Sequence, residues 1–171
     1  TTGAVAALLQ PINGHFAAQD VAKRQPVKLA AMEAHFETST YAPLLIGGIP
    51  DQQTGEVHYG IEIPGGLSLL AFDDPAAEVK GLNDYPRDEQ PPVLVVHLAF
   101  QVMVALGTAL MALGALSLFS MHRYPHWLES RRFLQALVVA MPLGFIAMEA
   151  GWIVTEVGRQ PWIIYGIMRT S

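Results

Sequence analysis

The sequence predicts an all-α membrane protein, a transmembrane helix bundle with a long extracytoplasmic loop that contains a short helix. Two observations carry this prediction. Two stretches that are almost free of charged residues exceed the roughly 20 residues that a helix needs to cross a bilayer. A segment of polar and turn-forming residues lies between positions 13 and 92. In keeping with this, 51% of the 171 residues are hydrophobic and only 15% are charged.

The N-terminal half is predicted to leave the membrane at the end of one helix and then to form a long loop. Residues 1–12 are uncharged but too short to span, and they are expected to be the end of a truncated transmembrane helix. Residues 13–92 are expected to form the extracytoplasmic loop. Within the loop, residues 25–37 predict a short helix because Pro26 suits a first turn, and Leu29, Met32 and Phe36 recur at helical spacing.

The two predicted spans are residues 93–121 and residues 133–157. The first contains no Asp, Glu, Lys or Arg, and the second is interrupted only by Glu149 and Glu156. The alternative, a buried helical hairpin of a soluble protein, fits less well because helices in such proteins average about 11–12 residues.

Orientation follows from the short connection at residues 122–132, which holds three arginines against one glutamate. The positive-inside rule places this connection in the cytoplasm. The loop at 13–92 and the C-terminal segment at 158–171 are then expected on the extracytoplasmic side.

Composition excludes several classes of protein. The net charge is −5 and cysteine is absent, so the chain is not expected to bind nucleic acid and holds no disulfide, thiolate metal site or cysteine nucleophile. No glycine-rich phosphate loop or serine nucleophile motif is present.

Two glutamates in the second span are candidates for proton or metal chemistry. Glu149 lies deep in the apolar run, where an ionisable side chain is costly and points to a functional role. Glu156 follows seven residues later on nearly the same helical face. The pair could form a proton relay or supply a carboxylate ligand to a metal. Alternatively, each glutamate pairs with a helix outside this sequence, or Glu156 lies near the interface.

Candidates in the first span are weaker when taken singly. The Met103 thioether could ligate haem iron, and Gly107 and Gly114 on that side would let a flat macrocycle or a helix approach closely. The alternative is that Met103 simply packs. His97 is expected to be a packed or capped histidine, because most such residues on apolar helices are not ligands.

In the loop, Lys28 and Glu33 lie five residues apart and could flank a polar ligand beside the short helix, or could belong to a solvated face. His122 and His126 are not expected to bind a metal together, because Pro125 between them disrupts the helix that such a pair needs.

Four motifs in order resemble the subunit I family of cytochrome bd-type quinol oxidases. They are Lys-Leu-Ala-Ala-Met-Glu at 28–33, Val-Met-Val at 102–104, Glu-Ala-Gly-Trp at 149–152 and the signature Gly-Arg-Gln-Pro-Trp at 158–162. Each motif alone is weak, but their order and spacing across nearly the whole chain are specific. One departure is Gln101, where many members carry an arginine.

The resemblance implies roles for these residues. Lys28 and Glu33 would bind and oxidise quinol in the 13–92 loop, and Met103 would ligate the iron of a low-spin haem b. Glu149 would ligate the iron of a high-spin haem b, or lie next to it, beside haem d or a third haem b. Further residues implied in cofactor binding are Trp152, Arg159, Gln160 and Trp162.

The implied function is that of the C-terminal part of subunit I, which passes electrons from quinol through haems to oxygen, reduces it to water and generates a proton gradient. The implied partners are the remaining helices of subunit I, which would carry the histidine ligands, together with subunit II, membrane lipid, quinol and oxygen. The implied location is the cytoplasmic membrane of a bacterium or archaeon. The alternatives are a non-catalytic membrane scaffold and an ion-translocating subunit that uses Glu149 and Glu156.

Overall fold

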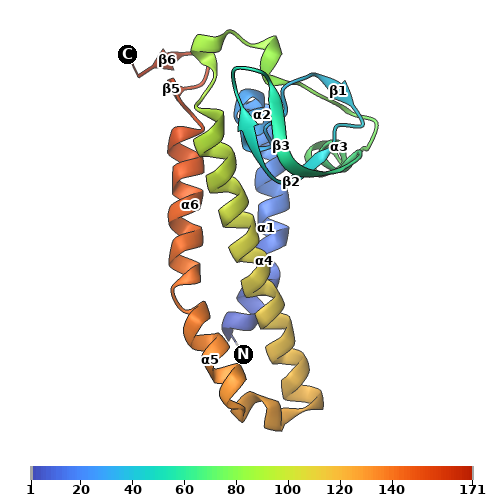
Figure 1. Ribbon diagram of the computed structural model, residues 1–171, viewed down its shortest axis with the longest axis vertical. Helices are drawn as coiled ribbons and strands as arrows, with labels where there is room; N and C mark the ends of the chain where they lie inside the picture. Colours follow the sequence, from blue (N-terminus) through green and yellow to red (C-terminus); the bar gives the residue numbers. More distant parts are fainter. Residues whose placement is uncertain (1, 171) are drawn as a thin grey trace.

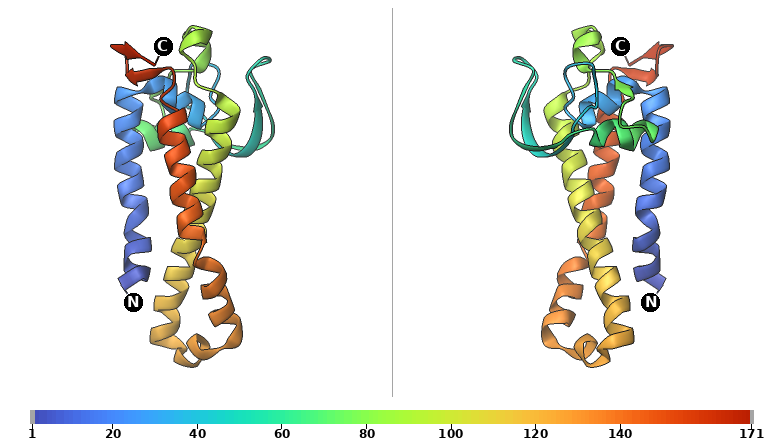
Figure 2. Two further views of the ribbon diagram at one scale, coloured as in Figure 1. Left: turned by 90° about the vertical axis from the view of Figure 1, so that its left-hand side faces the viewer. Right: turned by 90° about the vertical axis from the view of Figure 1, so that its right-hand side faces the viewer.

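The computed structural model describes residues 2–170. Three long helical segments lie side by side, and the short elements gather at one end of them (Figure 1; Figure 2). The helix α4 (Val93–Arg123) packs between α1 (Thr2–Arg24) and α6 (Leu143–Val157), and both neighbours run antiparallel to it. The remaining elements are α2 (Pro26–Met32), β1 (Ser39–Thr40), β2 (Leu44–Asp51), β3 (Glu56–Ile63), α3 (Gly66–Phe72), β4 (Glu78–Val79), the 3₁₀ turns η1 (Leu82–Asp84), η2 (Arg87–Glu89) and η3 (Pro125–Glu129), α5 (Arg131–Ala140), β5 (Trp162–Ile164) and β6 (Met168–Arg169).

Two helical segments are long and apolar enough to cross a membrane, namely α4 and the stretch Arg131–Val157 that comprises α5 and α6. Only 6% and 11% of their most apolar windows are buried within the chain. A core helix of a soluble protein would be mostly buried, so their exposure favours lipid or further helices as their surroundings.

The second predicted span is interrupted. Helix α5 ends at Ala140, and α6 begins at Leu143 after a turn at Met141 and Pro142. Proline has no backbone N–H, and its ring clashes with the carbonyl of the preceding turn, so one continuous helix over 133–157 is disfavoured. The expectation of an unbroken helix was therefore wrong at this point.

Helix α1 also differs from the prediction. It continues to Arg24, so residues 13–24 of the segment expected as a loop are helical and the boundary at residue 12 was wrong. The polar last turns are stabilised locally, because Asp20 and Arg24 form an i,i+4 ion pair of 2.7 Å and the basic end suits the helix dipole. At its other end, α1 meets α4 where Gly114 faces Ala4 and Ala7.

The loop contains strands, so the all-α prediction was too simple. Strands β2 and β3 form an antiparallel hairpin, with Leu44 opposite Ile63 and Asp51 opposite Glu56. Two further short pairs, β1–β4 and β5–β6, are also antiparallel. The turn at the hairpin tip includes Gly55 at a φ of +75°, a conformation that glycine adopts without strain.

Helix α2 lies at the centre of the outer module, the part of the chain comprising residues 25–92 and 158–170. All seven of its residues except Pro26 are buried. Its small apolar side chains pack against the first turns of α4, where Val93 and Val96 are fully buried. The predicted helix at 25–37 is confirmed but ends earlier, at Met32. Leu29, Met32 and Phe36 are all buried as expected.

Candidate functional site

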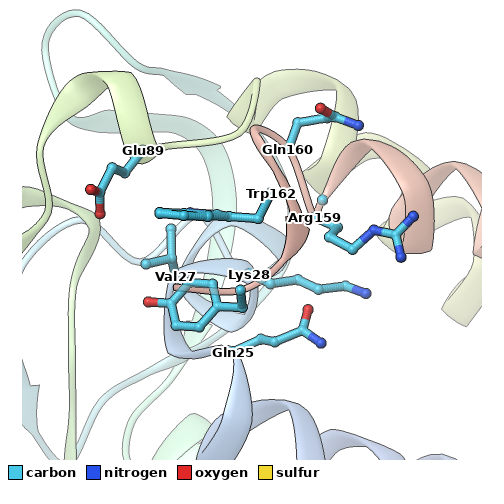
Figure 3. A pocket seen from close by; sticks show the side chains of 9 residues that line it. Gln25, Val27, Lys28, Glu89, Arg159, Gln160 and Trp162 are labelled. Carbon is cyan, nitrogen blue, oxygen red and sulfur yellow. The ribbon is translucent and has the colours of Figure 1, made fainter. Parts of the chain in front are cut away.

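Lys28 projects from α2 into a small recess formed with the Gly-Arg-Gln-Pro-Trp segment. Lys28 is only 8% exposed. Its side chain and the side chain of Arg159 extend toward the same side of the recess (Figure 3). Gly158 lies beside Lys28, and a Cβ there would lie 3.4 Å from Lys28 Cγ and would clash with the Val154 carbonyl oxygen. The recess is lined by Gln25, Val27, Lys28, Glu89, Gly158, Arg159, Gln160, Trp162 and Tyr165.

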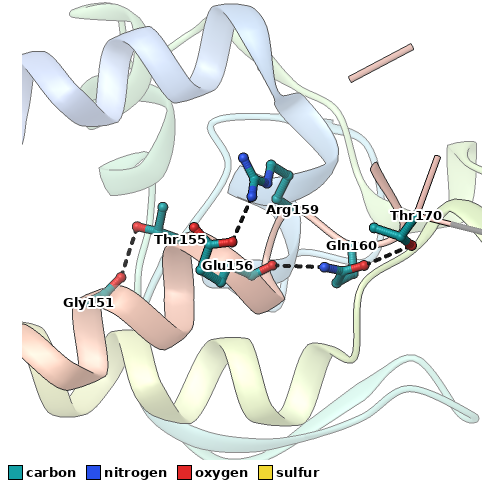
Figure 4. A network of polar contacts seen from close by, with 6 residues as sticks. All are labelled: Gly151, Thr155, Glu156, Arg159, Gln160 and Thr170. Carbon is teal, nitrogen blue, oxygen red and sulfur yellow. Dashed lines mark hydrogen bonds and ion pairs between the residues drawn. The ribbon is translucent and has the colours of Figure 1, made fainter. Parts of the chain in front are cut away.

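Burial lowers the pKa of Lys28, and the nearby Arg159 guanidinium lowers it further, whereas Glu156 raises it. Arg159 donates to Glu156 at 2.6 Å (Figure 4). Two N–H groups of the segment, Arg159 Nε and Trp162 Nε1, are buried without a hydrogen-bond partner among the described residues. Unpaired buried donors are costly, so the recess is suited to an acceptor oxygen.

The same segment is tied to the last strand. Gln160 donates to the Glu156 carbonyl at 3.4 Å and accepts from Thr170 at 3.2 Å (Figure 4). Arg169 in β6 lies over the Trp162 ring, 5.0 Å from its centroid. These contacts hold the segment against the end of α6 and the outer module.

Glu33 is the C-cap residue of α2 and is 3% exposed. Its Oε2 is buried without a hydrogen-bond partner within residues 2–170, and burial raises the pKa of its carboxyl to about 8. The residue lines a recess of about 300 Å³ between α2, the loop that follows it and the β2–β3 hairpin. The lining residues are Glu33, Ala34, His35, Phe36, Glu37, Ser39, Pro43, Leu45, Gly55, Val57 and Glu62.

Lys28 and Glu33 therefore line two different recesses. Five helical residues separate them by about 140° around the axis, which sends the side chains to different sides of α2. The structure thus brings Lys28 to Arg159 and Trp162, but does not bring Lys28 and Glu33 to one shared recess. Neither belongs to a solvated face.

The membrane-depth candidates lie on two neighbouring helices. Met103 is half-buried on α4, and a Cβ on Gly151 of α6 would lie 3.0 Å from its sulfur. One turn along α4, Gly107 faces open space, since nothing lies within 4 Å of an added Cβ. On α6, Glu149 and Trp152 are exposed, in an otherwise apolar stretch.

His97 is packed, as expected, and it is fully buried. Its Nδ1 lies 2.8 Å from the Met32 carbonyl oxygen and its Nε2 lies 3.1 Å from that of Gly47. A second polar contact, between Gln101 and the hairpin, was not predicted because the hairpin itself was not predicted.

The family model for cytochrome bd terminal oxidase subunit I matches residues 1–171. This chain belongs to that family. It is 42% identical, over its full length, to the putative cytochrome bd menaquinol oxidase subunit I of Bacillus subtilis, and 32% identical to the cytochrome bd ubiquinol oxidase subunit 1 of the same organism. It spans about 38% of the length of each of these relatives.

A solved structure gives the same result for the fold. The bd oxidase from Geobacillus thermodenitrificans matches 97% of this chain with a TM-score of 0.87 and 45% sequence identity, and the chain covers 38% of that protein chain. The arrangement of the three long helices and the outer module is therefore that of a cytochrome bd subunit I.

Proposed function

We propose that this chain is the part of a quinol oxidase subunit I that oxidises quinol at its outer module and delivers the electrons toward oxygen, which is reduced to water. Family membership supports the reaction class. The observation that carries the proposal is Glu33, a buried carboxyl with a free oxygen at a recess large enough for the ring of a quinol.

Glu33 is proposed as the acceptor of a quinol proton. A general base works best when its pKa is close to the working pH, and burial brings the pKa of Glu33 to about 8. An exposed glutamate, with a pKa near 4.5, would be a much weaker base. The exposed Glu37 and Glu62 at the rim of the recess offer onward acceptors for a proton leaving toward solvent.

Lys28 is proposed to stabilise negative charge that develops as quinol is oxidised. It acts from the other side of α2, together with Arg159 and the unpaired N–H of Trp162. The positive charges of Lys28 and Arg159 act at a distance across α2, because charges in a poorly hydrated region interact more strongly than in water.

The residues present suit the haem groups that the family implies. Met103 offers a thioether that lies against Gly151 of α6, one turn along α4 from the open space at Gly107, and Glu149 offers a carboxylate in an apolar stretch where it needs a partner. We propose that Met103 would hold the low-spin haem b, and that Glu149 and Trp152 would lie at the high-spin haem b, beside haem d or a third haem b. Haem, when bound, would carry single electrons from quinol to oxygen.

The proposed setting is the cytoplasmic membrane of a bacterium or archaeon, with the outer module on the extracytoplasmic side and the arginine-rich connection inside. The outer module and that connection lie at opposite ends of the long helices, as this orientation requires (Figure 1). The proposed partners are the other helices of subunit I and a second subunit.

The test uses the full-length oxidase complex with its haems. We expect K28M and E33Q each to lower quinol-dependent oxygen consumption at least tenfold while leaving the reduced haem spectrum unchanged. Normal turnover in both variants would reject quinol oxidation at this module. A complex without haem would favour a non-catalytic scaffold.

A further inference from the structure

Two polar side chains on successive turns of α4 hold the outer module by its backbone. His97, which is fully buried, faces the carbonyl oxygens of Met32 and Gly47 at 2.8 and 3.1 Å. Gln101 accepts from the Gly47 amide at 3.1 Å and donates to the Leu45 carbonyl at 3.0 Å. All four partners are main-chain atoms, so the contacts fix the path of the chain whatever side chains it carries.

These contacts reach the elements that border the Glu33 recess. Leu45 lines the recess, Met32 immediately precedes Glu33, and Gly47 follows Leu45 by two residues in β2. One wall is α2 and the other is strand β2 of the hairpin. His97 contacts α2 at Met32 and β2 at Gly47, and Gln101 contacts β2 at Leu45 and Gly47.

The same helix carries the proposed haem ligand. Met103 follows Gln101 by two residues, within one turn of α4. The contacts of His97 and Gln101 therefore connect the elements around Glu33, the proposed proton acceptor, to the helix that carries Met103, the proposed haem ligand.

We propose that His97 and Gln101 are positioning residues that set the width of the Glu33 recess and its place relative to Met103. This inference rests on the proposed function. Neither side chain touches quinol in this scheme, and both act through the backbone of α2 and β2. They thereby determine how well a quinol ring fits between Glu33 and the hairpin.

The contacts are strong enough to matter because their partners are buried. A carbonyl or amide that loses its partner away from water costs far more than an exposed one. A neutral imidazole has a single N–H and can donate to only one of the two carbonyls that His97 faces. Variants of His97 that preserve one contact and remove the other therefore distinguish the contribution of the α2 contact from that of the β2 contact.

The test uses the full oxidase complex and four variants of α4. Q101M keeps the length of the side chain but removes both hydrogen bonds. H97N retains an amide near the position of Nδ1 and H97Q one near that of Nε2, so each can keep the contact with one wall. S117A is the matched control, because Ser117 on the same helix donates to the Leu113 carbonyl one turn earlier and bonds to no other described residue.

We expect Q101M to lower kcat/KM for quinol about tenfold, mainly through KM, which is the effect of losing buried hydrogen bonds at a binding recess. Hydrogen exchange at the Gly47 amide should accelerate, while the reduced haem spectrum stays that of the unchanged protein. H97N and H97Q should each fall between the unchanged protein and Q101M, and S117A should match the unchanged protein.

Unchanged KM and unchanged exchange at Gly47 in Q101M would overturn the inference. Loss of the haem signal in Q101M, H97N and H97Q together would also overturn it, because the residues would then support the fold of α4 as a whole. If K28M and E33Q lose activity but Q101M does not, the proposed function stands and this inference fails. If K28M and E33Q are both normal, the proposed function itself fails.

Discussion

Replacing Glu33 by glutamine tests the proposed chemistry most directly, because it removes one ionisable group and changes the size and shape of the side chain very little. Glutamine has nearly the same shape and is neutral at every pH. Burial raises the pKa of Glu33 from 4.5 to about 8, which corresponds to an order-of-magnitude cost of about 5 kcal/mol for holding the ionised form in place. The other titratable groups at the recess are His35, Glu37 and Glu62.

The sign of the pH effect follows from the base role. Only ionised Glu33 can accept a proton, and at pH 7 roughly one carboxyl in ten is ionised when the pKa is about 8. We therefore expect kcat/KM for quinol to rise about tenfold per pH unit below pH 8 and to level off above it. E33Q should lose this rise and be about 100-fold slower at pH 8.

The assay is steady-state quinol oxidation by the full complex between pH 6 and 9, with haem content measured for each preparation. E78Q is the matched control, since Glu78 is exposed on β4 and is not among the residues that line the recess. We expect E78Q to retain the rise near pH 8. A rise of the same size in E33Q would refute the assignment of the base to Glu33.

The same ionisation also affects stability. The folded protein favours the protonated form of Glu33. The stability that this protonation provides is fully present below the pKa of the glutamate in the unfolded chain, near 4.5, and is lost as the pH rises through about 8. E33Q should therefore resist thermal inactivation at pH 8.5 better than the unchanged complex, and the advantage should vanish at pH 4.5. A constant advantage at both pH values would contradict the raised pKa.

Two further predictions concern other parts of the chain. M103L should remove or shift the low-spin haem b signal in the reduced spectrum, and an unaltered spectrum would exclude Met103 as a ligand. G81A should shorten the thermal half-life of quinol oxidation, because the new methyl group would clash with the Phe36 carbonyl, at a cost of about 1–3 kcal/mol. G14A, which adds a methyl to α1 where nothing lies within 4 Å, should leave the half-life unchanged or longer, and equal losses in both variants would refute the packing argument.

The sequence was informative wherever hydrophobic periodicity or a compact motif was present. The apolar runs predicted α4 and α6. Pro26, together with the helical spacing of the apolar residues that follow it, predicted α2. The hairpin was missed because glycines and a proline interrupt β2 and read as turns, although Val57 to Ile63 contains several residues typical of strands. The helical end of α1 was missed because its polar residues resemble a loop when no tertiary partner is known.

The candidate site residues could be named from the sequence, but their grouping in space could not. The five-residue spacing between Lys28 and Glu33 does not determine their neighbours. Lys28 lies near Arg159, which is 131 positions later in the sequence, whereas Glu33 lies near the hairpin. That division depends on which elements cover each side of α2, which is a tertiary property. The polar contacts of Gln101 depend on the hairpin in the same way.

The burial of α2 explains why its two charged side chains lie where they do. Apolar packing against α4 and the outer module covers the helix on nearly all sides, so Lys28 and Glu33 can reach polar surroundings only through the two recesses. Burying a lysine and a glutamate apart from each other costs stability that a direct ion pair would partly recover. A purely structural role would favour such a pair. Oxidation of a neutral quinol to an anionic intermediate and then to quinone is instead helped by a proton acceptor with a raised pKa and by a separate positive charge. The separation of the two residues is therefore itself an argument for catalysis over scaffolding.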